Sequence, residues 1–108
     1  MIEDGCQADW KEDAEVIGVK YDQEKPRYTL LPADALHEVV KVLTYGAQKY
    51  SDDNWKKVPD LQRRYSDALQ RHLYQARTET DDDESNLPHL AHAICCLLFK
   101  LQDELDAD

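Results

Sequence analysis

The sequence predicts an all-α fold, a small bundle of three main helices preceded by an extended N-terminal segment. The first observation is length, because 108 residues suit one domain with a single core. The second is that the apolar residues, 42% of the chain, gather in three segments with helical periodicity. The mean hydropathy of -0.76 would be compatible with disorder if these residues were scattered instead. We therefore expect a soluble, folded, acidic domain.

The N-terminal part divides into two segments. Residues 1–17 are acidic and aperiodic, so we expect a loose arm or one short helix that becomes ordered only by docking. In residues 18–28, Pro26 biases Lys25 away from helix, and we expect an extended segment. This segment holds a local basic patch, made of Lys20, Lys25 and Arg27. The domain itself is expected to span residues 18–105.

The first two helices are predicted from their apolar stripes. The first runs from about Pro32 to Tyr50, and proline is acceptable in its first turn. Its stripe consists of Leu36, Val39, Val40, Leu43, Ala47 and Tyr50. The second runs from about Leu61 to Glu79, after a loop that contains Trp55. Its stripe consists of Tyr65, Ala68, Leu69, His72 and Ala76.

The third predicted helix runs from about Leu87 to Leu105, with Asn86 or Ser85 as N-cap and Pro88 in the first turn. Its stripe consists of Leu87, Leu90, Ala91, Ile94, Leu98, Leu101 and Leu105. Three helices of about 18 residues, each roughly 27 Å long, suit a small bundle with a thin core. We therefore expect association through a second apolar face, which the third helix carries.

The charge balance excludes some functions. With 13 Lys plus Arg against 23 Asp plus Glu, the net charge is -10, which does not suit a protein that coats nucleic acid. An anionic ligand must then be met by a local basic cluster or a metal ion. The longest mostly apolar stretch, Leu90 to Phe99, is about half of the roughly 20 residues that a membrane span needs. We expect neither a nucleic-acid nor a membrane partner.

The N-terminus and the cysteines indicate the compartment. Residues 1–13 are acidic and contain no apolar run, unlike a secretory signal. The cysteines Cys6, Cys95 and Cys96 are odd in number and two are adjacent, which makes a poor disulfide framework. A reducing cytosol is the simplest compartment, so a cytoplasmic protein is expected.

Two histidines of the third helix are candidates for chemistry. His89 and His92 lie opposite the stripe with Ala93 and Cys96, on a side that is neither charged nor strongly apolar. At i and i+3 they can reach one point in space, as Glu-x-x-His pairs do in helical metal sites. The alternative is a pair of interface histidines that hydrogen-bond across helices. Spacing alone leaves both interpretations open.

Glu38 is a candidate in the first helix. Its neighbours on the helix face are Val42 and Tyr45, and a carboxylate among apolar residues needs a cation, a metal or a lysine as partner. The alternative is a glutamate at the rim of the packed face, paired with Lys41 or Lys49.

Further candidates follow along the chain. His72 lies inside the second stripe beside Arg71, and is either a satisfied core histidine or a ligand. The turn at residues 81–85 offers oxygen ligands of the kind Mg2+ prefers, without the spacing of a calcium loop. We expect most of this run to be solvated, with Glu84 as the exception because it lies beside the histidine helix. Trp55 stacks on a base or packs in a core or interface.

Several sequence blocks together resemble one known family. They are Gly18-Val19-Lys20-Tyr21-Asp22, Lys25-Pro26-Arg27-Tyr28, Leu30-Leu31-Pro32, Glu38-Val39, Tyr45-Gly46-Ala47-Gln48-Lys49-Tyr50, Asn54-Trp55, Arg71-His72-Leu73 and Glu84-Ser85-Asn86-Leu87-Pro88-His89-Leu90-Ala91-His92-Ala93. In this order they resemble the phage dATP/dGTP diphosphohydrolases, relatives of the MazG-like all-α nucleotide pyrophosphohydrolases. The resemblance covers about Gly18 to Leu101.

The resemblance implies a metal-dependent hydrolase that cleaves a purine deoxynucleoside triphosphate, chiefly dGTP and also dATP, to the monophosphate and pyrophosphate. In phages that replace adenine by 2-aminoadenine, the dGMP feeds the first step of the modified-base pathway. The resemblance also implies a MazG-like all-α homo-oligomer, a dimer or tetramer, with active sites between helices of more than one chain. If the chain is phage-encoded, it would work in the host cytoplasm.

The chain departs from the family pattern at three kinds of position. Glu24 and Asn86 stand where the family usually has glycine, although asparagine tolerates the left-handed backbone. Cys96 replaces an asparagine one turn beyond the second histidine. His89 and His92 fall where MazG-like enzymes carry the last pair of Mg2+-binding carboxylates, so those ligands do not transfer by residue type.

The resulting hypothesis assigns roles to the candidates. Glu38 and Glu84 hold Mg2+ or Mn2+, with His89 and His92 as ligands or as the base that orients water, so Glu38 and the two histidines are catalytic. The substrate-binding residues are Lys20, Asp22, Lys25, Arg27, Lys49, Trp55, Arg71 and His72. Two other interpretations remain: a small acidic protein that imitates the charge of DNA without catalysis, and a structural zinc-binding helical module.

Overall fold

The computed structural model of the chain describes residues 17–107. It divides into two compact units, residues 1–30 and residues 31–108, and each is described by itself. In the first unit, residues 17–30 are exposed and extended, apart from a turn and a short 3-10 helix, η1 (Tyr28–Leu30). The turn is closed by the Lys25 N–H, which donates to the Asp22 carbonyl at 3.1 Å. The predicted acidic arm lies almost wholly outside the described residues.

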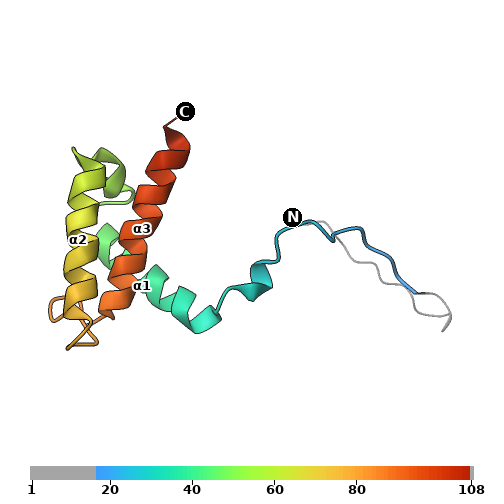
Figure 1. Cartoon of the computed structure of the whole chain (residues 1–108), viewed down its shortest axis with the longest axis horizontal. Coiled ribbons are helices and arrows are strands. Elements are labelled where there is room, and N and C mark those ends of the chain that lie inside the picture. Colours follow the sequence, from blue (N-terminus) through green and yellow to red (C-terminus); the bar gives the residue numbers. More distant parts are fainter. Residues whose placement is uncertain (1–16, 108) are drawn as a thin grey trace. The chain divides into compact units, whose positions relative to one another are not determined.

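The second unit contains three α-helices (Figure 1). They are α1 (Ala33–Lys49), α2 (Leu61–Gln75) and α3 (His89–Asp106), with a 3-10 helix, η2 (Asn54–Lys57), between the first two. The part of the chain that the structure describes forms no extended β-ladder, only an isolated bridge between Asp81 and Pro88. The all-α prediction is confirmed. Across residues 17–107, none of the helices has the length and apolar character needed to cross a bilayer.

Two helix boundaries differ from the prediction. The second helix ends at Gln75 rather than Glu79, because residues 76–78 leave the helix in a turn. The third helix begins at His89 rather than Leu87. Asn86 has a left-handed backbone (φ 60°) and Pro88 an extended one (φ -57°, ψ 136°), so neither continues a helix toward the N-terminus. The predicted tolerance of Asn86 for this backbone is confirmed.

The core lies where α3 meets α1. Val39 and Val42 pack against Ala91 and Cys95, and Leu87 and Phe99 lie around them. The Cys95 thiol also donates to the carbonyl of Val39, with 3.6 Å between the sulfur and the oxygen. This small apolar cluster fixes the position of α1 on α3.

The contact between α2 and α3 is more polar. The Gln62 amide nitrogen donates to the Lys100 carbonyl at 3.1 Å and to the Asp103 carboxylate at 2.9 Å. The Lys100 ammonium in turn donates to the Gln62 carbonyl at 3.3 Å and to the Ser66 hydroxyl. Figure 1 shows these two helices side by side. These hydrogen bonds of Gln62 and Lys100, called the polar clamp below, set the register of α2 on α3 near the C-terminal end of α3.

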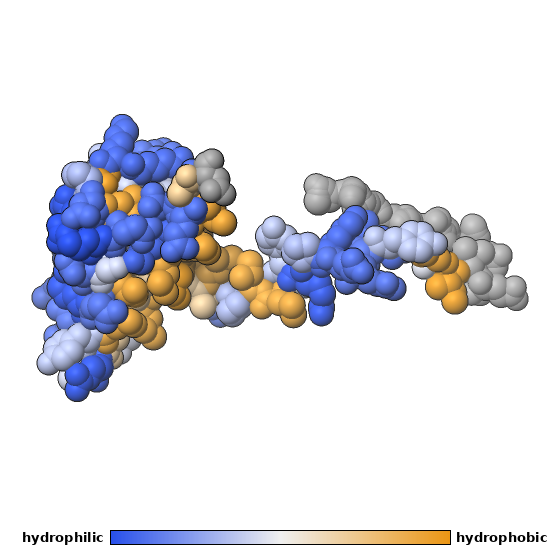
Figure 2. Space-filling model, turned by 45° about the horizontal axis from the view of Figure 1, so that its top comes forward, coloured by the Kyte–Doolittle hydropathy of each residue, from blue (hydrophilic) through white to orange (hydrophobic). Residues whose placement is uncertain are grey.

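The buried side of α3 is not the predicted leucine stripe. The buried residues are His89, Ala91, Ala93, Cys95 and Cys96, whereas most of the stripe is exposed, namely Leu90, Ile94, Leu98, Leu101 and Leu105, together with Leu97. Small side chains allow close helix approach, so α1 and α2 pack on the side that carries alanine and cysteine. Apolar side chains gather on one face of this unit (Figure 2). Of the predicted stripe, only Ala91 is fully buried.

Candidate functional site

A pocket of about 860 Å³ lies in the helical unit, between the end of α1, the loop that follows it, α2, the loop before α3, and α3 itself. Six of the predicted site residues line it: Lys49, Trp55, Arg71, His72, Glu84 and His92. A volume of this size suits a ligand such as a nucleotide. The structure therefore brings together residues that are up to 43 positions apart in the sequence.

The loop at residues 80–89 forms one wall of this pocket. The Asp82 N–H donates to the Leu87 carbonyl at 2.9 Å, and the Asn86 N–H donates back to the Asp82 carbonyl at 2.8 Å. The His89 N–H donates to the Thr80 carbonyl at 2.8 Å. The left-handed backbone of Asn86 lets the chain reverse within these few residues. These bonds turn Asp82 back toward the start of α3.

Asp82 is half-buried and held by its own loop. Its Oδ1 accepts the backbone N–H groups of Glu84 at 2.8 Å and Ser85 at 3.1 Å. Burial by itself would raise the pKa of Asp82, but the two N–H groups, with His92 and His72 nearby, hold it below its ordinary value. The carboxylate is therefore negative at neutral pH.

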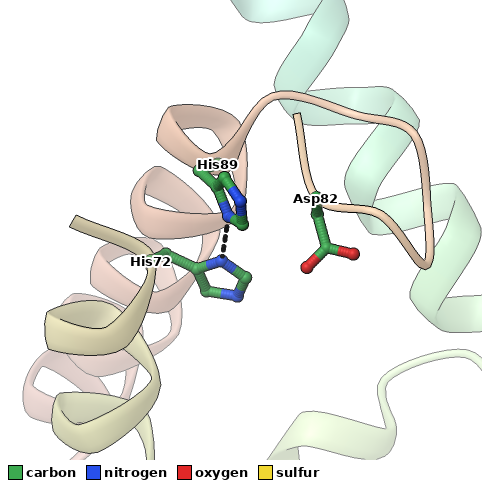
Figure 3. Close-up of side chains that lie close together, drawn as sticks. All are labelled: His72, Asp82 and His89. Atoms are coloured by element: carbon green, nitrogen blue, oxygen red, sulfur yellow. Dashed lines mark hydrogen bonds between the residues drawn. The ribbon is translucent and has the colours of Figure 1, made fainter. Parts of the chain in front are cut away.

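Three histidines lie beside this carboxylate. His72 Nδ1 is 3.0 Å from His89 Nδ1 (Figure 3), and the His72 ring stacks on His92 with 4.6 Å between the ring centroids. His89 is only 1% exposed. Burial, with His92 and His89 nearby, lowers the pKa of His72 to about 4, and burial also lowers the pKa of His92. Both of these rings are therefore neutral at pH 7.

This group is able to bind a metal ion. His72, Asp82 and His89 each offer one ligand atom, and these atoms lie within 4.8 Å of one another. Figure 3 shows that His72 and His89 face each other from neighbouring helices, with Asp82 beside them on the loop. Neutral imidazole and carboxylate are the protonation states that ligate metals.

His92 is oriented by the same loop. Its Nε2 lies 2.8 Å from the Ser85 hydroxyl oxygen, and this oxygen also accepts the Leu87 N–H at 3.2 Å. The edge of one ring of the Tyr45–His92 pair meets the face of the other, with 6.5 Å between the centroids. His92 is thus held at the pocket wall by contacts on two sides.

Lys49 and Glu84, which both line the pocket, form an ion pair. The Lys49 ammonium donates to Glu84 Oε2 at 2.6 Å, and the Tyr45 hydroxyl donates to the same oxygen at 2.9 Å. The hydrogen bond between Lys49 and Glu84 lowers the pKa of the Glu84 carboxyl and raises the pKa of the Lys49 ammonium. Both side chains remain accessible, at 40% and 60% exposure, so they can exchange partners with a ligand.

Aromatic packing holds the Trp55 side chain in position. Its ring stacks on Phe99 with 4.9 Å between the centroids and 12° between the planes, and Tyr65 meets Phe99 edge-on at 5.1 Å. Packing, one of the two predicted uses of Trp55, is therefore observed. Trp55 also lines the pocket, which keeps base stacking open.

The other predicted residues lie elsewhere. Glu38 forms an ion pair with Lys41 at 2.8 Å, one of the predicted alternatives, and does not line the pocket. The predicted substrate-binding residues Lys20, Asp22, Lys25 and Arg27 belong to the first unit.

The chain is similar to known proteins. The family model described as "dATP/dGTP diphosphohydrolase, N-terminal" matches residues 15–107. The chain belongs to this family. It is similar to a protein of Salmonella phage PMBT28 named "dATP/dGTP diphosphohydrolase", with 39% identity over 85 residues. The aligned part is 78% of this chain and 29% of the relative, so the chain spans less than a third of that relative's length. No solved structure matches.

The family resemblance drawn from the sequence blocks is thus confirmed, but the diphosphohydrolase family assignment did not reveal every residue of the site. Asp82 was counted among the solvated acidic residues, although it is recessed while Asp81 and Asp83 are exposed. The sequence predicts Ser85 as an N-cap or as part of the turn at residues 81–85, and its contact with His92 was not predicted. The signal that was available is Asn86, because a residue that tolerates a left-handed backbone marks a chain reversal.

Proposed function

We propose that this chain contributes the nucleotide site of an enzyme that hydrolyses purine deoxynucleoside triphosphates, chiefly dGTP and also dATP, to the monophosphate and pyrophosphate. The observation that carries the proposal is the pocket in which cations, carboxylates and neutral histidines meet, in a member of the dATP/dGTP diphosphohydrolase family. The name of the Salmonella phage relative supports the same substrates.

Within the pocket, Arg71 and Lys49 are proposed to neutralise the phosphates. Arginine matches phosphate oxygens with two parallel hydrogen bonds, while lysine acts as a point charge. Trp55 lines the pocket and is proposed to stack on a purine, and His72 forms part of the wall. Lys20, Lys25 and Arg27 are proposed to hold phosphates, and Asp22 is proposed as a further substrate-binding residue.

The reaction requires a water molecule to attack the α-phosphorus while the bond from this phosphorus to the bridging oxygen breaks. The electron pair leaves with pyrophosphate, and the proton of the water passes to a base. His92 is suited to that role because it lines the pocket and is neutral at pH 7. His89 is fully buried, so its proposed contribution is made through His72 and Asp82 rather than by touching substrate.

A divalent cation is part of the proposal. The exposed, negative carboxylate of Glu84 fits Mg2+ or Mn2+ bound together with nucleotide phosphates, because these ions take carboxylate and phosphate oxygens. Glu38 is another proposed ligand of this ion, and His92 is proposed as a ligand or as the base. Such an ion neutralises charge on the leaving pyrophosphate.

Assembly and context complete the proposal. We propose a cytoplasmic homo-oligomer, a dimer or tetramer, that supplies dGMP for 2-aminoadenine nucleotide synthesis in a phage. The exposed apolar face of α3 supports association, because exposed apolar patches mark interaction sites. In an oligomer, Glu38 of one chain would act at the site of another.

The test is an assay of the full 108-residue chain with each canonical dNTP and Mg2+ or Mn2+, measuring monophosphate and pyrophosphate. We expect dGTP to be the best substrate, and Arg71→Met to raise KM strongly, whereas Arg77→Met, an exposed change on the turn after α2, leaves it unchanged. Hydrolysis of none of the dNTPs would refute the proposal for this chain.

Glu38 needs its own comparison. Glu38→Gln should abolish pyrophosphate release without changing the helical circular dichroism, while Lys41→Met, which only removes its ion-pair partner, should retain activity. Equal activity in the two variants would remove Glu38 from the mechanism.

A further inference from the structure

We propose that His72, Asp82 and His89 form a resident binding site for one first-row transition-metal ion of the Zn2+ or Co2+ type, distinct from a Mg2+ that arrives with a nucleotide. The ligand atoms are Nδ1 of both histidines and one carboxylate oxygen of Asp82. The inference concerns metal binding alone, so it stands or falls independently of the proposed hydrolysis.

The two nitrogens are spaced for a shared ion. His72 Nδ1 and His89 Nδ1 are 3.0 Å apart. A usual zinc–nitrogen distance is about 2.05 Å. With an ion at that distance from both nitrogens, the nitrogen–metal–nitrogen angle would be about 94°. This angle lies between the values for octahedral and tetrahedral coordination, so binding requires little movement of either helix. In the structure these two atoms lie at hydrogen-bond distance, which requires a proton on one of them.

The second nitrogen of His89 supports this assignment. His89 Nε2 is buried, makes no hydrogen bond, and lies 3.5 Å from Glu79 Oε1. A histidine that ligates a metal carries its proton on the other nitrogen and directs it toward a carboxylate. In His89 the Glu79 carboxylate lies on the Nε2 side of the ring, and a short movement of this exposed side chain would close the bond.

Asp82 is prepared in the same way. The backbone N–H groups of Glu84 and Ser85 both donate to Asp82 Oδ1. These bonds fix the carboxylate and leave Oδ2 available for an ion. The loop bonds and the contact between α2 and α3 therefore bring the three ligand atoms within 4.8 Å of one another before an ion arrives, and binding would draw them closer.

The donor set selects the type of metal. Two imidazoles and one carboxylate suit transition ions, whereas Mg2+ prefers a shell of oxygens and keeps several waters. Because His72 and Asp82 line the pocket, the remaining coordination positions face the space where a ligand would bind. Three protein ligands with open positions are the pattern of catalytic rather than structural zinc sites.

The experiment uses the full chain, free of affinity tags and stripped with a chelator. Co2+ is titrated in, and its visible absorption and the binding heat are recorded. We expect one Co2+ per chain, displaced by Zn2+ and not by a large excess of Mg2+. Asp82→Asn and His72→Gln should remove the absorption band, while the matched controls Asp83→Asn and His37→Gln, both at exposed positions, should retain it.

Glu79→Gln is the finer test. It leaves all three ligands in place, and loss of the carboxylate partner should weaken Co2+ binding about 10–100-fold. Helical circular dichroism of every variant separates a lost site from a lost fold. Three results would overturn the proposal: no Co2+ bound by the folded chain, equal binding in Asp82→Asn and Asp83→Asn, or displacement of Co2+ by Mg2+. Metal binding without dNTP hydrolysis would refute only the proposed function.

Discussion

Replacing Phe99 by leucine tests how the aromatic wall of the pocket is held together. Phe99 stacks on Trp55 with 4.9 Å between ring centroids and meets Tyr65 edge-on at 5.1 Å. These contacts join η2 and α2 to α3, so the substitution removes two aromatic pairs at once while it keeps an apolar side chain at the position. The substitution should therefore lower the free energy of unfolding by more than the removal of one surface contact would.

The magnitude follows from these two pairs. At about 0.5–1.5 kcal/mol for each aromatic pair, Phe99→Leu should lower the free energy of unfolding by about 1–3 kcal/mol. A loss of about 2 kcal/mol corresponds to a fall in Tm of about 8–16 °C for a domain of this size. Urea unfolding followed by far-ultraviolet circular dichroism, at one fixed protein concentration, measures the change.

The control is Tyr74→Leu, the same kind of substitution at an exposed aromatic residue of α2, which should alter stability by less than about 0.5 kcal/mol. A double-mutant cycle of Phe99→Leu with Trp55→Leu should give a coupling of about 0.5–1.5 kcal/mol. If Phe99→Leu is no more costly than Tyr74→Leu, or if the cycle is additive, the stack does not hold Trp55 in place.

Three further outcomes are expected. Val39→Ala, at a core position with 3% exposure, should cost about 1–3 kcal/mol in urea unfolding, while Val40→Ala at 47% exposure should cost less than about 0.5 kcal/mol. Asn86→Val should destabilise by about 1–2 kcal/mol because its φ is 60°, and Asn86→Gly should be nearly neutral in the same assay. Burial raises the pKa of Cys95 to about 12, so at pH 8 only about one such thiol in ten thousand is ionised. In a Cys6→Ser background, the Cys95 thiol should react with a thiol reagent only after denaturation.

Much of the fold was predictable because the helices are strongly periodic. All three helices and the breaks between them follow from the spacing of apolar residues. The boundary errors come from the turn at residues 76–78 and from the backbone at Asn86 and Pro88. Periodicity did not reveal which side of α3 is buried. Hydrophobicity favours the leucines, whereas packing of two neighbouring helices favours the small residues.

The candidate site was predictable in part for a related reason. His72 and His92 were recognisable because a histidine on a packed face needs a partner, and the structure supplies one for each. Asp82 was not, since nothing in a run of acidic residues distinguishes the member that turns inward. That distinction depends on hydrogen bonds across the loop, which a sequence pattern does not encode.

The three sides of α3 explain how so short a chain positions this site. At 100° per residue, Ala91 and Cys95 lie on the side that meets α1, while His89, Ala93 and Cys96 share another side. His89 on that second side faces His72 of α2, so the contact between the helices and the contact between the histidines are one interface. Any shift of α2 along α3 would therefore separate the two ring nitrogens. The polar clamp of Gln62 and Lys100 resists that shift from the far end of the helix. Of the exposed leucines on the third side, only Leu98 lines the pocket, so this side is left mainly for the proposed association between chains.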